Sequence, residues 1–69
     1  MTHPATAAIL RYFEFQHLPP KLQEVSRPFA HLAARMVDTL PPGPEVTAGL
    51  RKLLEAKDCA VRAALPEVQ

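Results

Sequence analysis

Between Glu45 and Leu65 the chain reads EVTAGLRKLLEAKDCAVRAAL, and this stretch decides the fold. Apolar residues recur in it at spacings of three and four, which is typical of an amphipathic helix. The members of this apolar stripe are Val46, Leu50, Leu53, Leu54, Val61 and Leu65. Lys57 falls on the same stripe, where a leucine would be expected. Because burying an unpaired cation is costly, we expect one long helix whose lysine needs a partner.

Prolines divide the rest of the chain and predict two earlier helices. Pro4 suits the first turn of a helix that ends by about residue 15, before the stiff His17-Leu18-Pro19-Pro20 corner. A second helix is expected over about 20–40, with a near-heptad apolar spacing. Its apolar residues are Leu22, Val25, Phe29, Leu32, Met36 and Leu40.

Pro28 lies inside this second helix, where a proline loses a hydrogen bond and clashes with the preceding turn. Either the helix kinks near Glu24, or Ser26 caps a new helix with Pro28 in its first turn. The apolar spacing stays in phase across Pro28, which favours one kinked helix.

The segment Pro-Pro-Gly-Pro at 41–44 is an abrupt turn, and Pro66 should end the last helix. Gly49 costs a helix about 1 kcal/mol relative to alanine, which suggests the close approach of another backbone. Short connections between long helices give antiparallel neighbours. We therefore predict a single all-α domain over 1–69, with a short N-terminal helix across an antiparallel helical hairpin. The helices are expected at about 4–15, 20–40 and 45–65, and no strand is expected.

The small size of the chain favours self-association. A core built from 69 residues rarely supplies more than about 3–5 kcal/mol of net stability. Cys59 is the only cysteine, which excludes an internal disulfide, and the three histidines lack metal-binding spacing. Self-association is the remaining way to stabilise so small a chain, so we expect a homo-oligomer. Its interface is expected on a face of small residues that permits close helix approach. That face consists of Ala56, Cys59, Ala60 and Ala63.

The charge balance limits the classes of partner. The chain has eight Lys and Arg residues and seven Asp and Glu residues, which gives a net charge of +1. A general nucleic-acid binder is usually strongly basic. Nucleic acid is therefore not an expected partner, although a small local anion site is allowed. No apolar run reaches the roughly 20 residues that span a bilayer, and no signal peptide is apparent. With one free cysteine, the chain is expected in a reducing cytoplasm without a membrane partner.

Two groups of charged residues could bind an anion. Arg27, His31 and Arg35 are four residues apart on one helical face and could grip phosphates. The alternative is a solvated face with Arg35 paired to Asp38. In the last helix, the pairs Arg51–Glu55 and Asp58–Arg62 have the spacing of ion pairs within one helix. Asp58 could also position Arg62 for an external anion.

The roles of Lys57 and Tyr12 can each be interpreted in more than one way. Lys57 is a snorkelling lysine at the edge of the core, a partner of Glu24 or Asp38, or an anion ligand. Tyr12 either stacks on a nucleobase or joins the core, where Phe13 is expected. Cys59 has no histidine nearby in sequence, and the chain lacks the common catalytic and metal motifs. We therefore expect no enzyme, no catalytic residue and no cofactor.

The run HLPPKLQEVSRPF at 17–29, followed by LRKLLEAKD at 50–58 and VRA at 61–63, resembles a family of very small bacteriophage and prophage proteins. The resemblance covers roughly 13–65 and implies a viral origin and a life in the bacterial cytoplasm. It does not name an activity. A looser resemblance, in size, helical architecture and self-association, is to the phage cyclic-nucleotide sponges that counter CBASS and Thoeris immunity. Besides the architecture, the feature of this chain that matches the sponges is a basic residue near the end of the last helix, Arg62.

The sponge resemblance implies that host signalling nucleotides are bound between subunits without cleavage. Our first hypothesis is such a sponge, in which cations neutralise phosphates and Tyr12 stacks on a base. The expected ligand-binding residues are Lys57, Arg62, Arg27, Arg35, His31 and Tyr12. The alternative is a helical protein-binding module that inhibits or adapts a host or phage protein and exposes a Phe, Leu and Met patch. A small DNA-binding regulator is disfavoured by the near-zero charge and by the lack of helix-turn-helix spacing.

Overall fold

The computed structural model describes residues 4–68, and every regular element in that range is helical. The elements are α1 (Pro4–Leu10), the 3-10 turn η1 (Arg11–Phe13), α2 (Pro20–Thr39) and α3 (Pro44–Val68). Each α-helix begins at a proline, whose fixed φ and missing N–H suit the first turn. The prediction of an all-α chain is confirmed for the described range.

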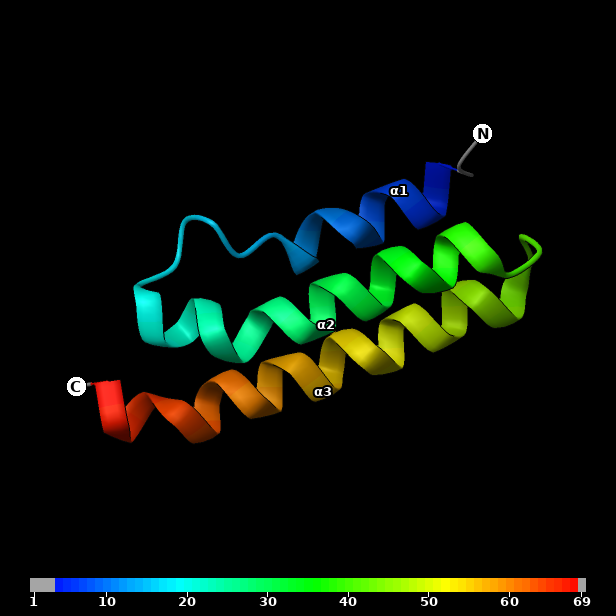
Figure 1. Cartoon of the computed structure of the whole chain (residues 1–69). Coiled ribbons are helices and arrows are strands. Elements are labelled where there is room, and N and C mark those ends of the chain that lie inside the picture. The colour runs from blue at the N-terminus through cyan, green and yellow to red at the C-terminus, as the bar shows by residue number, and fades with distance from the viewer. Residues whose placement is uncertain (1–3, 69) are drawn as a thin grey trace.

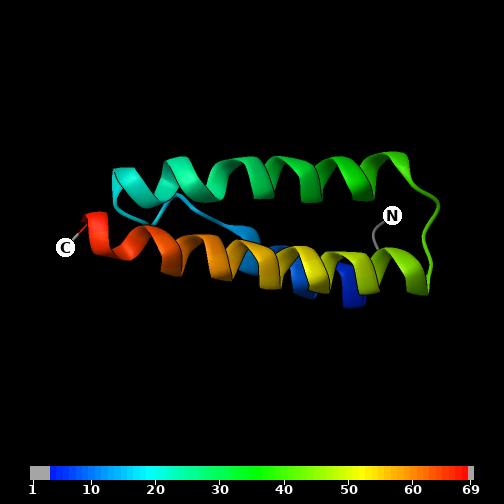
Figure 2. The same cartoon turned by 90° about the horizontal axis from the view of Figure 1, so that it is seen from below.

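The three helices lie along one another in an elongated body of 39 × 18 × 17 Å. Figures 1 and 2 show α2 and α3 side by side, running in opposite directions and joined by residues 40–43. The shorter α1 contacts both of them over the half of the molecule near that connection, and η1 contacts α2 and, through a hydrogen bond from Lys57, α3. Residues 14–19 then lead to the start of α2 at the opposite end.

The core lies where α1, α2 and α3 meet. Its buried residues are Ile9, Phe13, Ala33 and Leu50, and half-buried apolar side chains of α2 and α3 surround them. Leu50 is completely buried, and every predicted member of the α3 stripe is buried or half-buried. The apolar pattern of α3 therefore predicted its inward face correctly.

Four of the six apolar residues predicted for the second helix are buried or half-buried, and two are not. Leu32 and Leu40 are 48% and 45% exposed, whereas Ser26 and Ala33 are completely buried. The reason is that α2 packs against α1 as well as α3, which centres its inward face on small residues that allow close approach. Pro28 lies inside a continuous α2, so Ser26 does not start a new helix.

Three predicted details of the helices are wrong. The third helix does not end before Pro66 but continues to Val68. Pro66 is near the end of α3, and the carbonyl four residues before it belongs to exposed Arg62, so little tertiary structure depends on the lost hydrogen bond. The predicted first helix tightens into η1 and ends at Phe13. At Gly49 the approaching group is the Cε of Met36, a side-chain atom and not another backbone.

Candidate functional site

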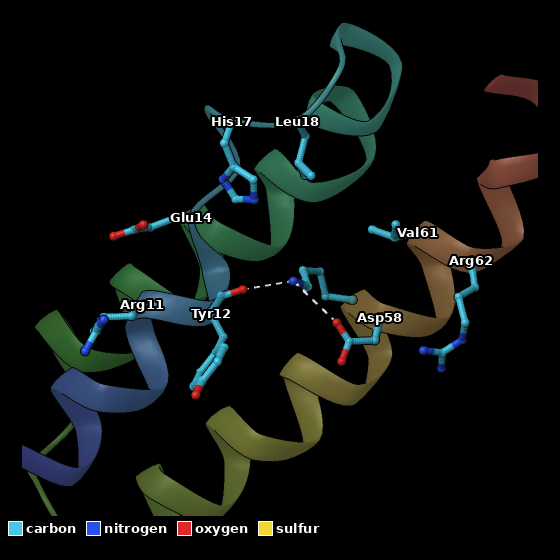
Figure 3. A pocket seen from close by; sticks show the side chains of 9 residues that line it. Arg11, Tyr12, Glu14, His17, Leu18, Asp58, Val61 and Arg62 are labelled. Atoms are coloured by element: carbon cyan, nitrogen blue, oxygen red, sulfur yellow. Dashed lines mark hydrogen bonds and ion pairs between the residues drawn. The ribbon is translucent and has the colours of Figure 1, made fainter. Parts of the chain in front are cut away.

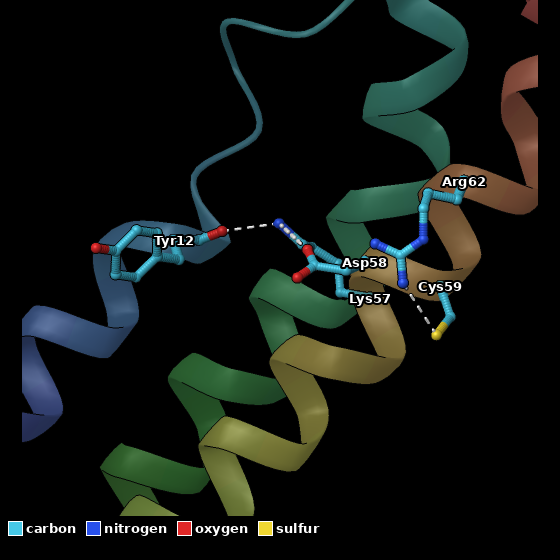
Figure 4. A network of polar contacts seen from close by, with 5 residues as sticks. All are labelled: Tyr12, Lys57, Asp58, Cys59 and Arg62. Carbon is cyan, nitrogen blue, oxygen red and sulfur yellow. Dashed lines mark hydrogen bonds and ion pairs between the residues drawn. The ribbon is translucent and has the colours of Figure 1, made fainter.

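Lys57 connects α3 to η1. Its Nζ donates a hydrogen bond to the backbone carbonyl oxygen of Tyr12 at 2.8 Å and lies 3.4 Å from Asp58 Oδ1 (Figures 3 and 4). Tyr12 is in the last turn before the chain leaves its helical path, where carbonyls lack helical donors and a cation is favourable. The Lys57 side chain is only 13% exposed, so its stem packs at the edge of the core. The predicted alternative of pairing with Glu24 or Asp38 is wrong.

A groove of about 380 Å³ surrounds this contact. It lies between α3 on one side and η1 with its following connection on the other (Figure 3). Its lining residues are Arg11, Tyr12, Glu14, His17, Leu18, Lys57, Asp58, Val61 and Arg62. The groove thus combines three cations with two carboxylates, one histidine and the apolar side chains of Leu18 and Val61.

The accessible cations define what this groove can bind. Lys57 uses one of its three donors on Tyr12 O and faces Asp58 with another, which leaves one donor for a ligand. Arg62 and Arg11 are exposed, and a guanidinium can hold a phosphate or carboxylate through two parallel hydrogen bonds. Tyr12 is 66% exposed, so its ring can stack on a planar group.

The other predicted ligand residues lie outside this groove. Arg27 places its Cζ 5.5 Å from the centre of the Phe15 ring, a cation–π distance. His31 meets the same ring edge-on, with centroids 6.3 Å apart. Arg35 is exposed on α2. The six predicted residues therefore divide: Tyr12, Lys57 and Arg62 share the groove, whereas Arg27 and His31 pack around Phe15 and Arg35 is apart from both.

The ion pairs predicted within the helices do not form among residues 4–68. Asp58 pairs with Lys57, and Arg62 donates instead to Cys59 Sγ at 3.4 Å (Figure 4). Neither Arg51–Glu55 nor Arg35–Asp38 is an ion pair in this range. Spacings of three or four residues permit such pairs, but long exposed side chains gain little from them and adopt other rotamers.

Arg11, Glu14 and His17 were missed by the sequence reasoning although they line the groove. A signal existed, since three titratable residues lie within five positions of Tyr12. Their relevance depends on the connection after η1 lying beside α3, which no local pattern indicates.

The predicted interface residues lie on the outer side of α3. Ala56, Cys59 and Ala63 are exposed and Ala60 is half-buried. In Figure 1 one side of α3 faces away from α1 and α2, and the spacing and exposure of Ala56, Cys59 and Ala63 assign them to that side.

Neither a protein-family model, a curated protein nor a solved structure matches this chain. Within residues 4–68, no helix is both long and apolar enough to cross a bilayer. In the same range, no three His, Cys, Asp or Glu side chains gather as a metal site would require. The functional argument therefore rests on the groove itself.

Proposed function

We propose that the protein is a phage anti-defence protein that sequesters a host signalling nucleotide, a cyclic oligonucleotide or a related molecule, without cleaving it. It acts as a homo-oligomer of helical hairpins in the bacterial cytoplasm. The observation that carries the proposal is the groove in which Tyr12 and Arg62 lie on either side of Lys57 (Figure 4).

The chemistry of the groove suits a nucleotide. Arg62 supplies a bidentate phosphate contact, and the remaining Lys57 donor adds a second cation. Asp58 repels an anion only weakly, because Lys57 lies 3.4 Å from its carboxylate. Tyr12 provides a ring for base stacking, a contact worth about 1–3 kcal/mol.

The size of the groove indicates how a larger ligand is held. Small-molecule pockets usually span about 300–1,000 Å³, and this groove of about 380 Å³ is at the lower end. One groove fits a single nucleotide unit, so a cyclic dinucleotide or trinucleotide would occupy grooves from more than one subunit. Self-association and ligand binding are therefore parts of one mechanism.

Native mass spectrometry tests the proposal directly. The protein is measured alone and after incubation with a bacterial nucleotide extract, and an added mass of one nucleotide ligand per site is expected. Titration calorimetry with cyclic dinucleotides and trinucleotides then gives affinities, because sequestration requires dissociation constants on the order of nanomolar. No added mass and no binding at about 100 µM would refute the proposal.

A matched pair of variants assigns the binding to the groove. Arg62→Ala removes a guanidinium that lines the groove, whereas Arg35→Ala removes a guanidinium of α2 that is also exposed but does not line the groove. Arg62→Ala should weaken binding about tenfold or more, as loss of a charge-assisted contact does, and Arg35→Ala should not. Equal effects of the two variants would mean that net charge, and not the groove, attracts the ligand.

A further inference from the structure

The folded chain exposes more surface than a compact monomer of its mass. Its accessible surface is 4985 Å², whereas folded monomers of 7.6 kDa expose about 4,300 Å². The excess is similar to the roughly 800 Å² that one partner buries in a standard interface. The body is elongated, with extents of 39 × 18 × 17 Å, so its long side offers room for a second copy.

Two unpaired charges on α3 indicate how that copy docks. Glu55 and Arg62 are exposed and seven residues apart, which places them on the same flank of the outer face. Neither has an ion-pair partner within the described chain, where the guanidinium of Arg62 donates a hydrogen bond to Cys59 Sγ. Ala56 and Ala63 occupy the opposite flank, with Cys59 between the two flanks, so small side chains allow a second helix to approach.

We propose that the outer face of α3 binds the same face of a second copy in an antiparallel pair centred near Cys59. A two-fold axis at this position places each Glu55 opposite Arg62 of the second copy, so two ion pairs form on one flank. On the other flank, Ala56 meets Ala63 of the second copy. In a parallel pair the charged flank of one copy would instead face the Ala56 and Ala63 flank of the other, so neither Glu55 nor Arg62 would gain an ion-pair partner.

This dimer deepens the proposed function, because it rests on the proposed self-association and names its surface. Arg62 belongs to both the groove and the outer face of α3. A guanidinium has five N–H donors, so Arg62 can bind Glu55 of the second copy and still face a ligand. The mouth of the groove then lies beside the boundary between subunits.

Charge reversal tests the pairing. Sedimentation equilibrium should give the native protein twice the 7.6 kDa mass of one chain. Glu55→Arg and Arg62→Glu should each raise the dimer dissociation constant about tenfold or more, since both ion pairs become like-charge contacts. The double variant should restore dimerisation to within about threefold of the native protein, because the reversed charges attract again. A monomeric native protein, or a double variant no better than the singles, overturns the pairing.

Cross-linking tests the position of the axis. Helices packed through small residues approach to about 8 Å, within reach of a short bis-maleimide joining the two Cys59 thiols. The native protein should cross-link to a dimer, whereas Cys59→Ala/Ala34→Cys, with its only thiol on exposed α2, should not. An oligomer that cross-links equally in both proteins would refute this surface while leaving self-association intact. Binding of a mononucleotide by the charge-reversed Glu55→Arg monomer would support the groove independently of the dimer, because one groove fits a single nucleotide unit.

Discussion

The Nζ of Lys57 donates a 2.8 Å hydrogen bond to the backbone carbonyl oxygen of Tyr12, which lies 45 residues earlier in the chain. This contact explains why a lysine occupies a leucine position on α3. Its aliphatic stem fills the edge of the core, while its ammonium satisfies a carbonyl at the end of η1. The same bond holds η1 against α3 and so keeps the two sides of the groove together.

Replacement of Lys57 by methionine should destabilise the fold although it keeps an apolar stem of similar length. The variant loses a hydrogen bond from a charged donor, a contact worth about 1.5–3 kcal/mol, and the extra burial of methionine offsets part of this. We expect the free energy of unfolding in urea to fall by about 1–2 kcal/mol. The Lys57–Asp58 ion pair contributes little of this, because the Asp58 side chain is 46% exposed.

Lys52→Met is the matched control, since Lys52 is exposed on α3 and has no polar partner among the described residues. Its stability should stay within about 0.5 kcal/mol of the native protein. If both lysine variants unfold at the same urea concentration as the native protein, the hydrogen bond from Lys57 to Tyr12 contributes nothing to the stability of the fold.

Gly49→Ala should stabilise the protein. A Cβ at this position would lie 3.2 Å from the Cε of Met36, which is tight, but that atom is the end of a flexible side chain. Alanine favours a helix over glycine by about 1 kcal/mol, so a net gain of about 0.5–1 kcal/mol is expected in thermal or urea unfolding. Gly49→Val adds further atoms against Met36 and should destabilise. A destabilised Gly49→Ala variant would show that Met36 cannot move.

Ser26→Ala should also stabilise the fold. Ser26 is completely buried, and its Oγ has no hydrogen-bond partner among residues 4–68. An unpaired buried hydroxyl costs about 1–3 kcal/mol, so its removal should raise the unfolding free energy by about 1 kcal/mol. Thr39→Ala is the control, because the Thr39 hydroxyl donates to Arg35 O on the exposed surface and should change stability little. A loss of more than about 1 kcal/mol in Ser26→Ala would mean that the hydroxyl is bonded in solution.

The elements that the sequence predicted best are those whose signals are local. The period of α3 identified Leu50 as inward-facing, and the prolines at 4, 20 and 44 marked the helix starts. On α2 the same reasoning failed for Leu32, because two neighbours, α1 and α3, determine which face is inward. The period of one helix does not show how many helices pack against it.

The candidate site was predictable only in part for the same reason. Lys57 stood out because it interrupted an apolar stripe, and this irregularity was a local signal. Its acceptor, the carbonyl of Tyr12, depends on a contact between segments 45 residues apart. His17 lines the groove because the connection after η1 lies beside α3. Arg27 lies outside the groove, where its guanidinium packs against the Phe15 ring.

Substitutions of Tyr12 and of its neighbour Phe13 should distinguish an effect on ligand binding from an effect on folding. Tyr12 is 66% exposed and Phe13 only 2%, and the Lys57 contact uses the Tyr12 backbone, which survives substitution. Tyr12→Ala should therefore unfold within about 0.5 kcal/mol of the native protein, yet lose about 1–3 kcal/mol of nucleotide affinity in titration calorimetry. Phe13→Ala removes core packing worth about 3–5 kcal/mol, close to the whole stability of so small a chain, and should lose its helical circular dichroism. Native nucleotide affinity in Tyr12→Ala would remove the base-stacking role from Tyr12, the one Phe, Tyr or Trp side chain that lines the groove within the described residues.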